Sequence, residues 1–414
     1  MKKSVLSIYC IFIWGVFCFA QNQNKWIQDI EYYHKTLEDK HIDLYHRISK
    51  EEFSSEIEKL KSYLDELTDF QIIVELMRLT HKVGGGKGDG HTSVPLWNRE
   101  KLNYPIKIFD FDGELRVISA DKKNKALLGK ILKSIDGTPI EDVYKKVSEL
   151  TPFTENKLSS MDRSCSYMMN SEILEAINVT KSIEQAEFKV RDDNGDYDSI
   201  ILKSYNKEEL LELEHKTILV SHPSINRPKE TKFKNLWFTS LNEARTVFIN
   251  FKQYPSEEDM DEFSEGVYNF IEKNKSKNLI IDLRDNYGGD FFIGQILASW
   301  LNACDSLDWK SGIYVLTNRI TYSAAMVNAL QFRELLNAKI VGEPTGANPN
   351  GYQDLGQFNL PNSKVLITFT KRLFRLQDIN TEGVQPDVLI NPKWKNYKNG
   401  EDEVLNWVLI DLNN

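Results

Sequence analysis

The sequence predicts a mixed α/β protein, and three observations support this. Apolar residues recur at three- and four-residue steps through 25–83, which is the spacing of amphipathic helices. Short apolar runs separated by turn residues fill 104–205 and indicate a β-rich segment. From 236 to 414, apolar runs of strand length alternate with helical patterns, which predicts βαβ units with a partly parallel sheet.

Composition limits the classes of protein and partner. The chain has 414 residues, of which 41% are hydrophobic, so it can bury a sizeable core. Its 61 acidic and 52 basic residues give a net charge of −9. This balance argues against a nucleic-acid binder and against a polybasic membrane-surface protein. Four cysteines are too few for a disulfide scaffold or a multi-cysteine metal site.

Residues 1–20 are predicted to be a secretory signal peptide. A basic start precedes an almost wholly apolar run over 4–19, which ends in small residues at Cys18 and Ala20. The run is shorter than the ~20 residues of a membrane-spanning helix, and the bulky Phe17 argues against lipidation of Cys18. We therefore expect an exported protein, periplasmic or extracellular, with no membrane span after cleavage.

The first domain, over 21–91, is predicted to hold about three helices. Its apolar residues fall on two helical faces, formed by Trp26, Ile27, Ile30, Tyr33 and Leu37 and by Phe53, Ile57, Leu60 and Leu64. Thr68 is the expected N-cap of a helix that runs to about His81. Five glycines between 84 and 90 then end the helix and leave His91 in a loop.

The second domain, over 104–205, is predicted to be β-rich with a helical insert at 150–185. Apolar runs on both sides of Asp112-Gly113 are typical of a hairpin. The acidic residues at 192–196 do not have the spacing of a twelve-residue calcium loop, so we interpret them as a hairpin tip. Residues 206–235 are rich in Lys, Glu and His and are expected to form a solvated connection.

The third domain, over 236–414, is expected to contain the parallel sheet. Strands are predicted at 246–251, 278–283 and 313–316, and helices at 260–272, 292–301 and 323–335, with a short helix from Glu401. Export would permit a disulfide between Cys165 and Cys304, the two cysteines of the mature chain.

Two turns of this domain carry candidate chemistry. One strand leads into Gly288 and Gly289, whose N–H groups are suited to binding an anion or an oxyanion. The Gly-Lys-Ser/Thr ending of a phosphate loop is absent. Another strand leads to Ser323 at the start of a helix, where a serine is either an N-cap or a nucleophile.

His91 is the candidate general base. Of seven histidines, it alone lies in a glycine-rich turn between two domains. A serine nucleophile needs a base with a pKa near neutrality, and histidine is the usual one. A plain surface histidine remains the alternative.

The third domain resembles the C-terminal-processing and tricorn-type serine peptidases. The matching residues are, in order, Asp282-Leu283-Arg284-Asp285-Asn286-Tyr287-Gly288-Gly289, Ser323-Ala324-Ala325, Gly342-Glu343-Pro344-Thr345-Gly346 and Glu382-Gly383-Val384-Gln385-Pro386-Asp387. The resemblance implies a crotonase/ClpP-like ββα-type catalytic core over 236–414. Residues 128–137 resemble part of a PDZ-like module, which implies that 104–205 is a PDZ-like domain.

The family has two catalytic branches. One uses a Ser–Lys dyad, but the corresponding stretch here, 346–353, contains no lysine, and neither Lys339 nor Lys364 fits the motif. The tricorn-like branch uses a serine, a histidine from earlier in the chain and a glutamate. The resemblance therefore implies the set Ser323 (nucleophile), His91 (base) and Glu382 (orienting). Gly90 departs from the pattern, because tricorn enzymes carry a further serine there.

The resemblance also implies the remaining parts of the site. The oxyanion hole is assigned to Gly288, Gly289 and Ala324, and substrate binding to Arg284, Asn286 and Tyr287. The expected substrate is a peptide or protein, added as an extra strand to the PDZ-like domain, with no metal or organic cofactor. The oligomeric state is not predicted. Two alternatives stay open: a non-catalytic protein that binds peptides or small ligands on the same scaffold, and an esterase, although the Gly-x-Ser-x-Gly elbow is missing.

Overall fold

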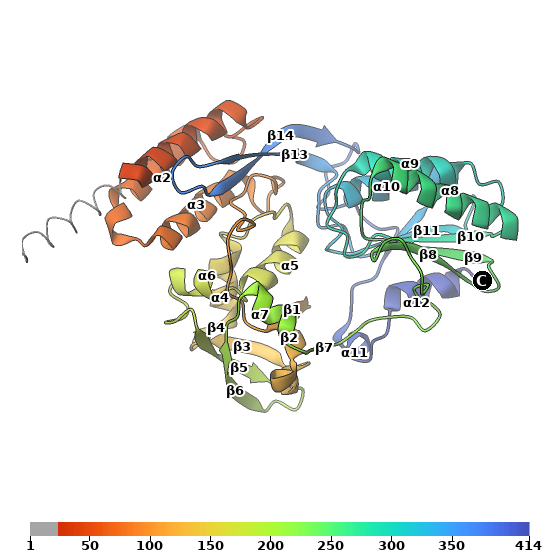
Figure 1. The fold of residues 1–414 in the computed structure, drawn as a ribbon, viewed down its shortest axis with the longest axis horizontal. Helices are drawn as coiled ribbons and strands as arrows, with labels where there is room; N and C mark the ends of the chain where they lie inside the picture. Colours follow the sequence, from red (N-terminus) through yellow and green to blue (C-terminus); the bar gives the residue numbers. More distant parts are fainter. Residues whose placement is uncertain (1–23, 414) are drawn as a thin grey trace, which may run out of the picture.

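The computed structural model describes residues 24–413, which form three units (Figure 1). Along the chain, a helical unit comes first, a unit built on an antiparallel sheet comes second, and an α/β unit comes third. The predicted signal peptide lies outside the described residues. Within 24–413, no helix is long and apolar enough to cross a membrane.

Three helices build the first unit. They span 24–40, Lys50–Ser62 (α2) and Asp69–Gly84 (α3). Thr68 caps α3 as predicted: its hydroxyl accepts the N–H of Gln71, and the Gln71 side chain accepts the N–H of Thr68. The helix ends where the glycine-rich run begins.

Seven strands form the sheet of the second unit, in the order β1-β2-β3-β5-β6 with β4 on β3 and β7 on β2. They are β1 (Ile106–Phe111), β2 (Glu114–Asp121), β3 (Ile131–Ile135), β4 (Thr138–Pro139), β5 (Gln185–Arg191), β6 (Tyr197–Lys203) and β7 (His215–Thr217). The insert between β4 and β5 holds α4 (Ile140–Ser148), α5 (Lys157–Tyr167) and α6 (Ser171–Ala176). Both hairpins predicted for this segment are present, around Asp112-Gly113 and at 192–196.

The stretch at 206–235 is not only a connection. It contains α7 (Lys207–Glu212) and β7, which pairs with β2. All three residues of β7 are exposed, so the strand carries no apolar pattern. It is held instead by backbone pairing and by a 2.7 Å hydrogen bond between the hydroxyls of Thr217 and Ser119.

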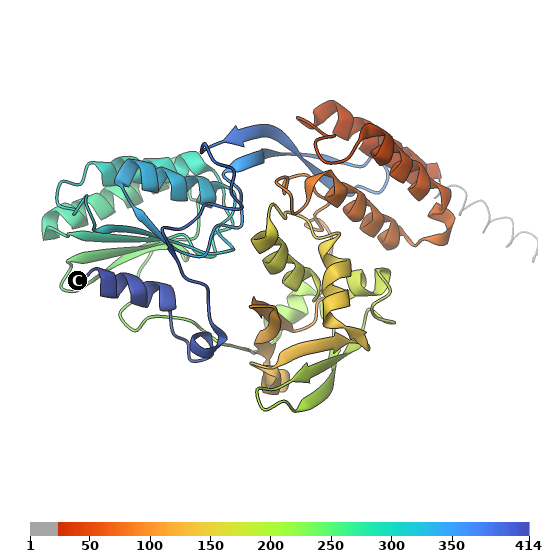
Figure 2. The ribbon, with the colours of Figure 1, turned by 180° about the vertical axis from the view of Figure 1, so that it is seen from behind.

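The third unit contains the predicted parallel sheet, in the order β15-β12-β11-β10-β9-β8. Its strands are β8 (Leu236–Leu241), β9 (Thr246–Phe251), β10 (Asn278–Asp282), β11 (Ile313–Thr317), β12 (Lys339–Gly342) and β15 (Val388–Leu389), and only the β8–β9 pair is antiparallel. Three helices cover one face: α8 (Glu257–Asn274), α9 (Phe291–Asn302) and α10 (Ala324–Leu336). On the other face lies α12 (Glu403–Asp411), which follows α11 (Trp394–Tyr397) (Figure 2).

A long hairpin joins the third unit to the first. It consists of β13 (Asn350–Asn359) and β14 (Leu366–Arg375) and extends from the α/β unit toward the N-terminal helices (Figure 1). Its apolar side chains Leu360, Ile367 and Phe369 belong to the core of the first two units. The N–H of Ile42 also donates to the Thr370 carbonyl at 3.1 Å. The sequence did not predict this link.

The permitted disulfide is not formed. Cys165 and Cys304 are both buried with free thiols. They lie in different hydrophobic cores, Cys165 in that of the first two units and Cys304 in that of the third.

Candidate active site

Ser323 occupies a sharp turn between β11 and α10. Its backbone has φ 47° and ψ −120°, a region that side-chain-bearing residues rarely adopt. Its side chain does not cap the helix, which removes the N-cap interpretation. Strained backbone of this kind persists only when its surroundings enforce it, and it concentrates at functional sites. The turn presents a half-buried hydroxyl at the positive end of α10.

Gly288 lies directly against this turn. With φ +90°, an added Cβ would stand 2.9 Å from the Cβ of Ser323, 2.9 Å from the Tyr322 carbonyl oxygen and 3.1 Å from the N of Ala324. No side chain fits in that space. Glycine is therefore required here both for its backbone conformation and for the close approach.

The predicted oxyanion donors are not equivalent. The N–H of Gly288 already donates to Oδ1 of Asn286 at 2.9 Å, so the structure does not support Gly288 as a donor. Within the described part of the chain, the N–H groups of Gly289 and Ala324 donate to no other residue. Those two N–H groups remain the candidates.

Two residues predicted to bind substrate make bonds within the fold. Arg284 is held between two carboxylates: its guanidinium donates to both oxygens of Asp282 at 2.8–2.9 Å and to both oxygens of Asp402 at 2.8 Å. Asn286 is fully buried, and its amide donates to the Phe251 carbonyl at 2.7 Å. Both side chains are thus occupied by bonds within the fold, and their role in substrate binding stays a prediction.

Tyr287, the third of these residues, remains available. Its side chain is 63% exposed, and its ring lies 5.8 Å from that of Tyr322, the neighbour of Ser323. The exposed face of this ring is free to contact a bound substrate. The role of Tyr287 in substrate binding stays a prediction.

The Gly-Glu-Pro-Thr-Gly motif packs against the residues that precede Ser323. Glu343 is buried and accepts from Nη2 and Nε of Arg319 at 2.6 and 2.9 Å. A side chain at Gly346 would collide with the Arg319 carbonyl and the Tyr322 ring. The motif therefore packs the loop that leads into Ser323.

His91 is buried, and no described residue hydrogen-bonds to its Nδ1. Burial lowers its pKa from the ordinary value, and the charge of Arg163 acts in the same direction. Asp89, Asp354 and the main chain of Tyr352 act in the opposite direction. The imidazole is thus held neutral at pH 7, as a general base requires.

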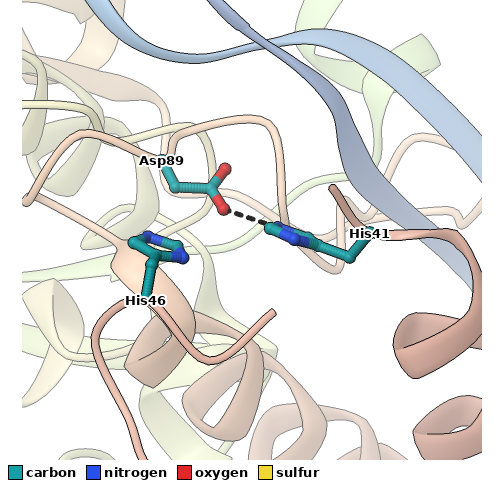
Figure 3. Close-up of side chains that lie close together, drawn as sticks. All are labelled: His41, His46 and Asp89. Atoms are coloured by element: carbon teal, nitrogen blue, oxygen red, sulfur yellow. Dashed lines mark hydrogen bonds and ion pairs between the residues drawn. The ribbon is translucent and has the colours of Figure 1, made fainter. Parts of the chain in front are cut away.

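The loop that carries His91 is anchored through Asp89. Its carboxylate is fully buried and accepts from the Thr92 N–H at 3.1 Å, the Thr92 hydroxyl at 2.8 Å and the Thr370 hydroxyl of β14 at 2.7 Å. Nε2 of His41 lies 2.9 Å from Oδ2 of Asp89 (Figure 3). These bonds tie the histidine loop to both the first helices and the long hairpin.

His41, His46 and Asp89 also bring three potential metal-ligand atoms within 4.8 Å of one another (Figure 3). The hydrogen bonds argue against a metal centre there. Nδ1 of His41 accepts the N–H of Asp43 at 2.9 Å, so Nε2 carries the proton and donates it to Asp89. A metal ion needs that lone pair free, and we interpret the cluster as a hydrogen-bonded anchor.

Glu155 is the carboxylate that faces His91. Its Oε1 lies 3.8 Å from Nδ1 of His91, while its Oε2 accepts from the Asn348 N–H at 2.9 Å and from Nε2 of Gln353 at 2.8 Å. Burial raises its pKa to about 7. No sequence pattern points to Glu155, because a single acidic residue within a predicted helical insert is ordinary.

Glu382 lies on a cavity wall near Glu155. Both residues line a cavity of about 920 Å³ between the glycine-rich loop and the base of the long hairpin. The backbone of Glu382 is fixed, since the next N–H, that of Gly383, donates to Asn348 at 2.8 Å. Its side chain is exposed and makes no hydrogen bond to His91. The orienting role of Glu382 stays a prediction.

The segment from 153 to 163 lies between the serine and the histidine. Asp162 accepts the Tyr322 hydroxyl at 2.8 Å, and the Arg163 guanidinium lies 4.3 Å from the Tyr322 ring. At the other end of this segment, Glu155 faces His91. No hydrogen bond joins Ser323 to His91 within residues 24–413.

Comparisons with known proteins concern the fold and one segment of the third unit. Residues 297–390 match the model of peptidase family S41. The structure of mature CPAF aligns with a TM-score of 0.66 at 12% identity, over 94% of this chain and 96% of that chain. Weaker alignments are found with the photosystem II D1 C-terminal processing protease (TM-score 0.41, 15% identity, 89% and 93% coverage) and with the tricorn protease (0.39, 15%, 87% and 34%). No curated protein sequence matches this chain.

The family match falls on the segment that contains α10 and the Gly-Glu-Pro-Thr-Gly and Glu-Gly-Val motifs. The likeness to CPAF extends the shared fold over nearly the whole chain. The mixed α/β architecture expected from the sequence is thus confirmed, and residues 297–390 match peptidase family S41, the family of serine peptidases that the sequence motifs resemble.

Proposed function

We propose that this chain is an exported peptidase that cleaves peptide bonds through an acyl-enzyme, with Ser323 as nucleophile, His91 as general base and Glu382 as orienting group. The observation that carries the proposal is the strained Ser323 turn, packed against Gly288, with its hydroxyl free of any capping bond. A serine held in this geometry is suited to nucleophilic attack and unsuited to a structural role.

The chemistry follows the usual steps of acyl transfer. The Ser323 oxygen attacks the substrate carbonyl carbon while His91 takes the hydroxyl proton, and the carbonyl oxygen becomes an oxyanion. The N–H groups of Gly289 and Ala324 stabilise it, and one such donor contributes ~3–4 kcal/mol. The C–N bond then breaks, and His91 returns its proton to the leaving amine. Water, activated by His91, hydrolyses the ester and releases Ser323.

The proposal requires His91 to approach Ser323 when substrate binds. Catalytic hydrogen bonds are commonly long or absent without substrate and shorten in the reactive complex. The cavity of about 920 Å³ that Glu155 and Glu382 line is large enough for a peptide segment. The middle domain, as the proposed PDZ-like module, would take the substrate chain as an added strand.

Covalent labelling tests the nucleophile. A fluorophosphonate probe should label the wild type, and the Ser323→Ala variant should show no labelling and no hydrolysis of fluorescent casein. The His91→Ala variant should lose hydrolysis with an unchanged melting temperature. Equal labelling of wild type and Ser323→Ala would reject this nucleophile. A wild type that binds peptides and is never labelled would favour the binding-protein alternative.

Export is tested separately. Expression of the full chain followed by N-terminal sequencing should find a mature protein beginning near Gln21 in the periplasmic or secreted fraction. A protein that keeps Met1 inside the cell would contradict this part of the proposal and leave the catalytic part intact.

A further inference from the structure

One nitrogen of His91 lacks a partner although it is buried. Nδ1 makes no hydrogen bond to any described residue, and a buried polar atom without a partner costs roughly 1–3 kcal/mol. The carboxylate oxygen facing it is Oε1 of Glu155, 3.8 Å away. That oxygen accepts no hydrogen bond from any described residue, so a buried nitrogen without a partner faces a carboxylate oxygen that is free to accept. The distance between them is about 1 Å longer than a hydrogen bond.

Glu155 is held so that only this oxygen remains open. Asn348 and Gln353 both donate to Oε2, which fixes the carboxylate plane. The backbone around it is tied to the histidine loop, because Gly86 donates to the Thr154 carbonyl at 2.7 Å and Gly88 to the Glu155 carbonyl at 2.8 Å. A side chain anchored on one oxygen and open on the other is preorganised to accept one further proton donor.

Gly90 makes room for this carboxylate. A Cβ at position 90 would stand 2.5 Å from Cγ of Glu155 and 3.2 Å from the Phe153 carbonyl carbon. Any side chain beside His91 would therefore displace Glu155. The glycine that departs from the tricorn pattern is the residue that lets a buried glutamate reach the histidine.

We propose that Glu155 is a positioning residue for catalysis: its Oε1 accepts the Nδ1 proton of His91 when the site closes on substrate. The imidazole is then held in the tautomer whose Nε2 is unprotonated and ready to take the Ser323 proton. This inference rests on the proposed function of Ser323 and His91. It leaves no place at Nδ1 for Glu382, whose exposed carboxylate lies on the cavity wall.

The groups around Glu155 and His91 predict how turnover should depend on pH if Glu155 positions His91. Burial raises the pKa of Glu155 to about 7, Asp89 acts in the same direction, and Arg163 and the two hydrogen bonds to Oε2 act in the opposite one. Burial and Arg163 lower the pKa of His91, while Asp89, Asp354 and the hydrogen bond to the main chain of Tyr352 raise it. Since only ionised Glu155 can accept the Nδ1 proton, turnover should rise as the pH passes through about 7.

The Glu155→Gln variant tests the role, with Glu382→Gln as the matched control. Asn348 and Gln353 both donate, so a glutamine would turn its carbonyl oxygen to them and its NH₂ group to His91. That favours the wrong tautomer, for which a loss of up to ~10⁴-fold in kcat has a precedent. For casein hydrolysis and fluorophosphonate labelling, we expect a 10²- to 10⁴-fold loss of rate with little change in KM. The remaining activity should rise at a lower pH than in the wild type.

The outcomes separate the two proposals. If Glu155→Gln retains activity and the wild-type pH profile while Glu382→Gln loses them, Glu155 has no positioning role, and the serine assignment stands. If Ser323→Ala remains active, the proposed function itself fails. Should Glu155→Gln not fold, ¹⁵N-histidine NMR of the Ser323→Ala variant saturated with a casein peptide at pH 8 replaces it, with His91→Gln in the same background used for assignment. A protonated Nδ1 supports the proposal, and a protonated Nε2 overturns it.

Discussion

The close approach of Gly288 to the serine turn makes a sharp prediction for Gly288→Ala. The residue has φ +90°, a conformation that costs an L residue about 1–2 kcal/mol. The new methyl group would also meet the Ser323 Cβ at 2.9 Å, where carbon atoms prefer roughly 3.5–4.0 Å. The turn must therefore shift by about 0.5–1 Å. Such a misplacement of reacting groups costs roughly 10²-fold in rate.

Gly137→Ala is the matched control. Gly137 also has a positive φ, +79°, but a methyl group there meets no atom within 4 Å. Gly137→Ala should lose about 1–2 kcal/mol of unfolding free energy, measured by urea denaturation, and Gly288→Ala should lose at least as much, because its methyl group also collides with the serine turn. Only Gly288→Ala should lose about 10²-fold or more in the rate of fluorophosphonate labelling. Equal labelling rates in the two variants would refute the contact between Gly288 and the nucleophile as a requirement for catalysis.

Three further predictions concern buried charges. Arg284→Met leaves the carboxylates of Asp282 and Asp402 facing each other and should lower the free energy of unfolding by about 3–5 kcal/mol, measured by urea denaturation. An arginine that only binds substrate would instead change KM and leave the stability unchanged. For Asp89, burial disfavours ionisation, but the hydrogen bonds from His41, Thr370 and Thr92 outweigh it and lower the pKa below 3.8. The stability advantage of wild type over Asp89→Asn should therefore be full above about pH 4 and disappear as the pH falls through the lowered pKa; an equal difference at pH 7 and pH 3 would contradict this. For Glu155 the effect of pH on stability is the reverse, because burial raises its pKa from 4.5 to about 7. Wild type should lose roughly 3 kcal/mol relative to Glu155→Gln between about pH 4.5 and 7, and a flat difference over that window would show that Glu155 is not desolvated.

The parallel sheet could be predicted because its strands are buried on both faces. Strands such as β9 and β10 are continuous apolar runs, and the helices between them carry a helical period. The long hairpin could not be predicted in the same way. Its apolar residues pack onto helices more than 300 positions earlier in the chain, and nothing in a local pattern encodes that distance.

The candidate site shows the same contrast between local patterns and contacts between distant residues. The sequence motifs identify Ser323, Ala324 and Gly289 because their geometry is local to one strand–turn–helix unit. Arg284 was predicted to bind substrate only because the family resemblance covers its motif. Its actual partner, Asp402, lies 118 residues further along the chain.

The two halves of the site are also assembled differently. The serine turn is held chiefly by contacts inside the third unit, those of Gly288 and of the Arg319–Glu343 pair, with a further bond from Tyr322 to Asp162 of the second unit. The histidine loop has local bonds from Thr92 to Asp89, and it is also bound to two distant residues, His41 of the first unit and Thr370 of β14. Within residues 24–413, no hydrogen bond joins Ser323 to His91, so each part of the proposed site is held by its own contacts. The proposed mechanism therefore requires substrate binding to bring His91 to Ser323, and it does not require either part to be rebuilt.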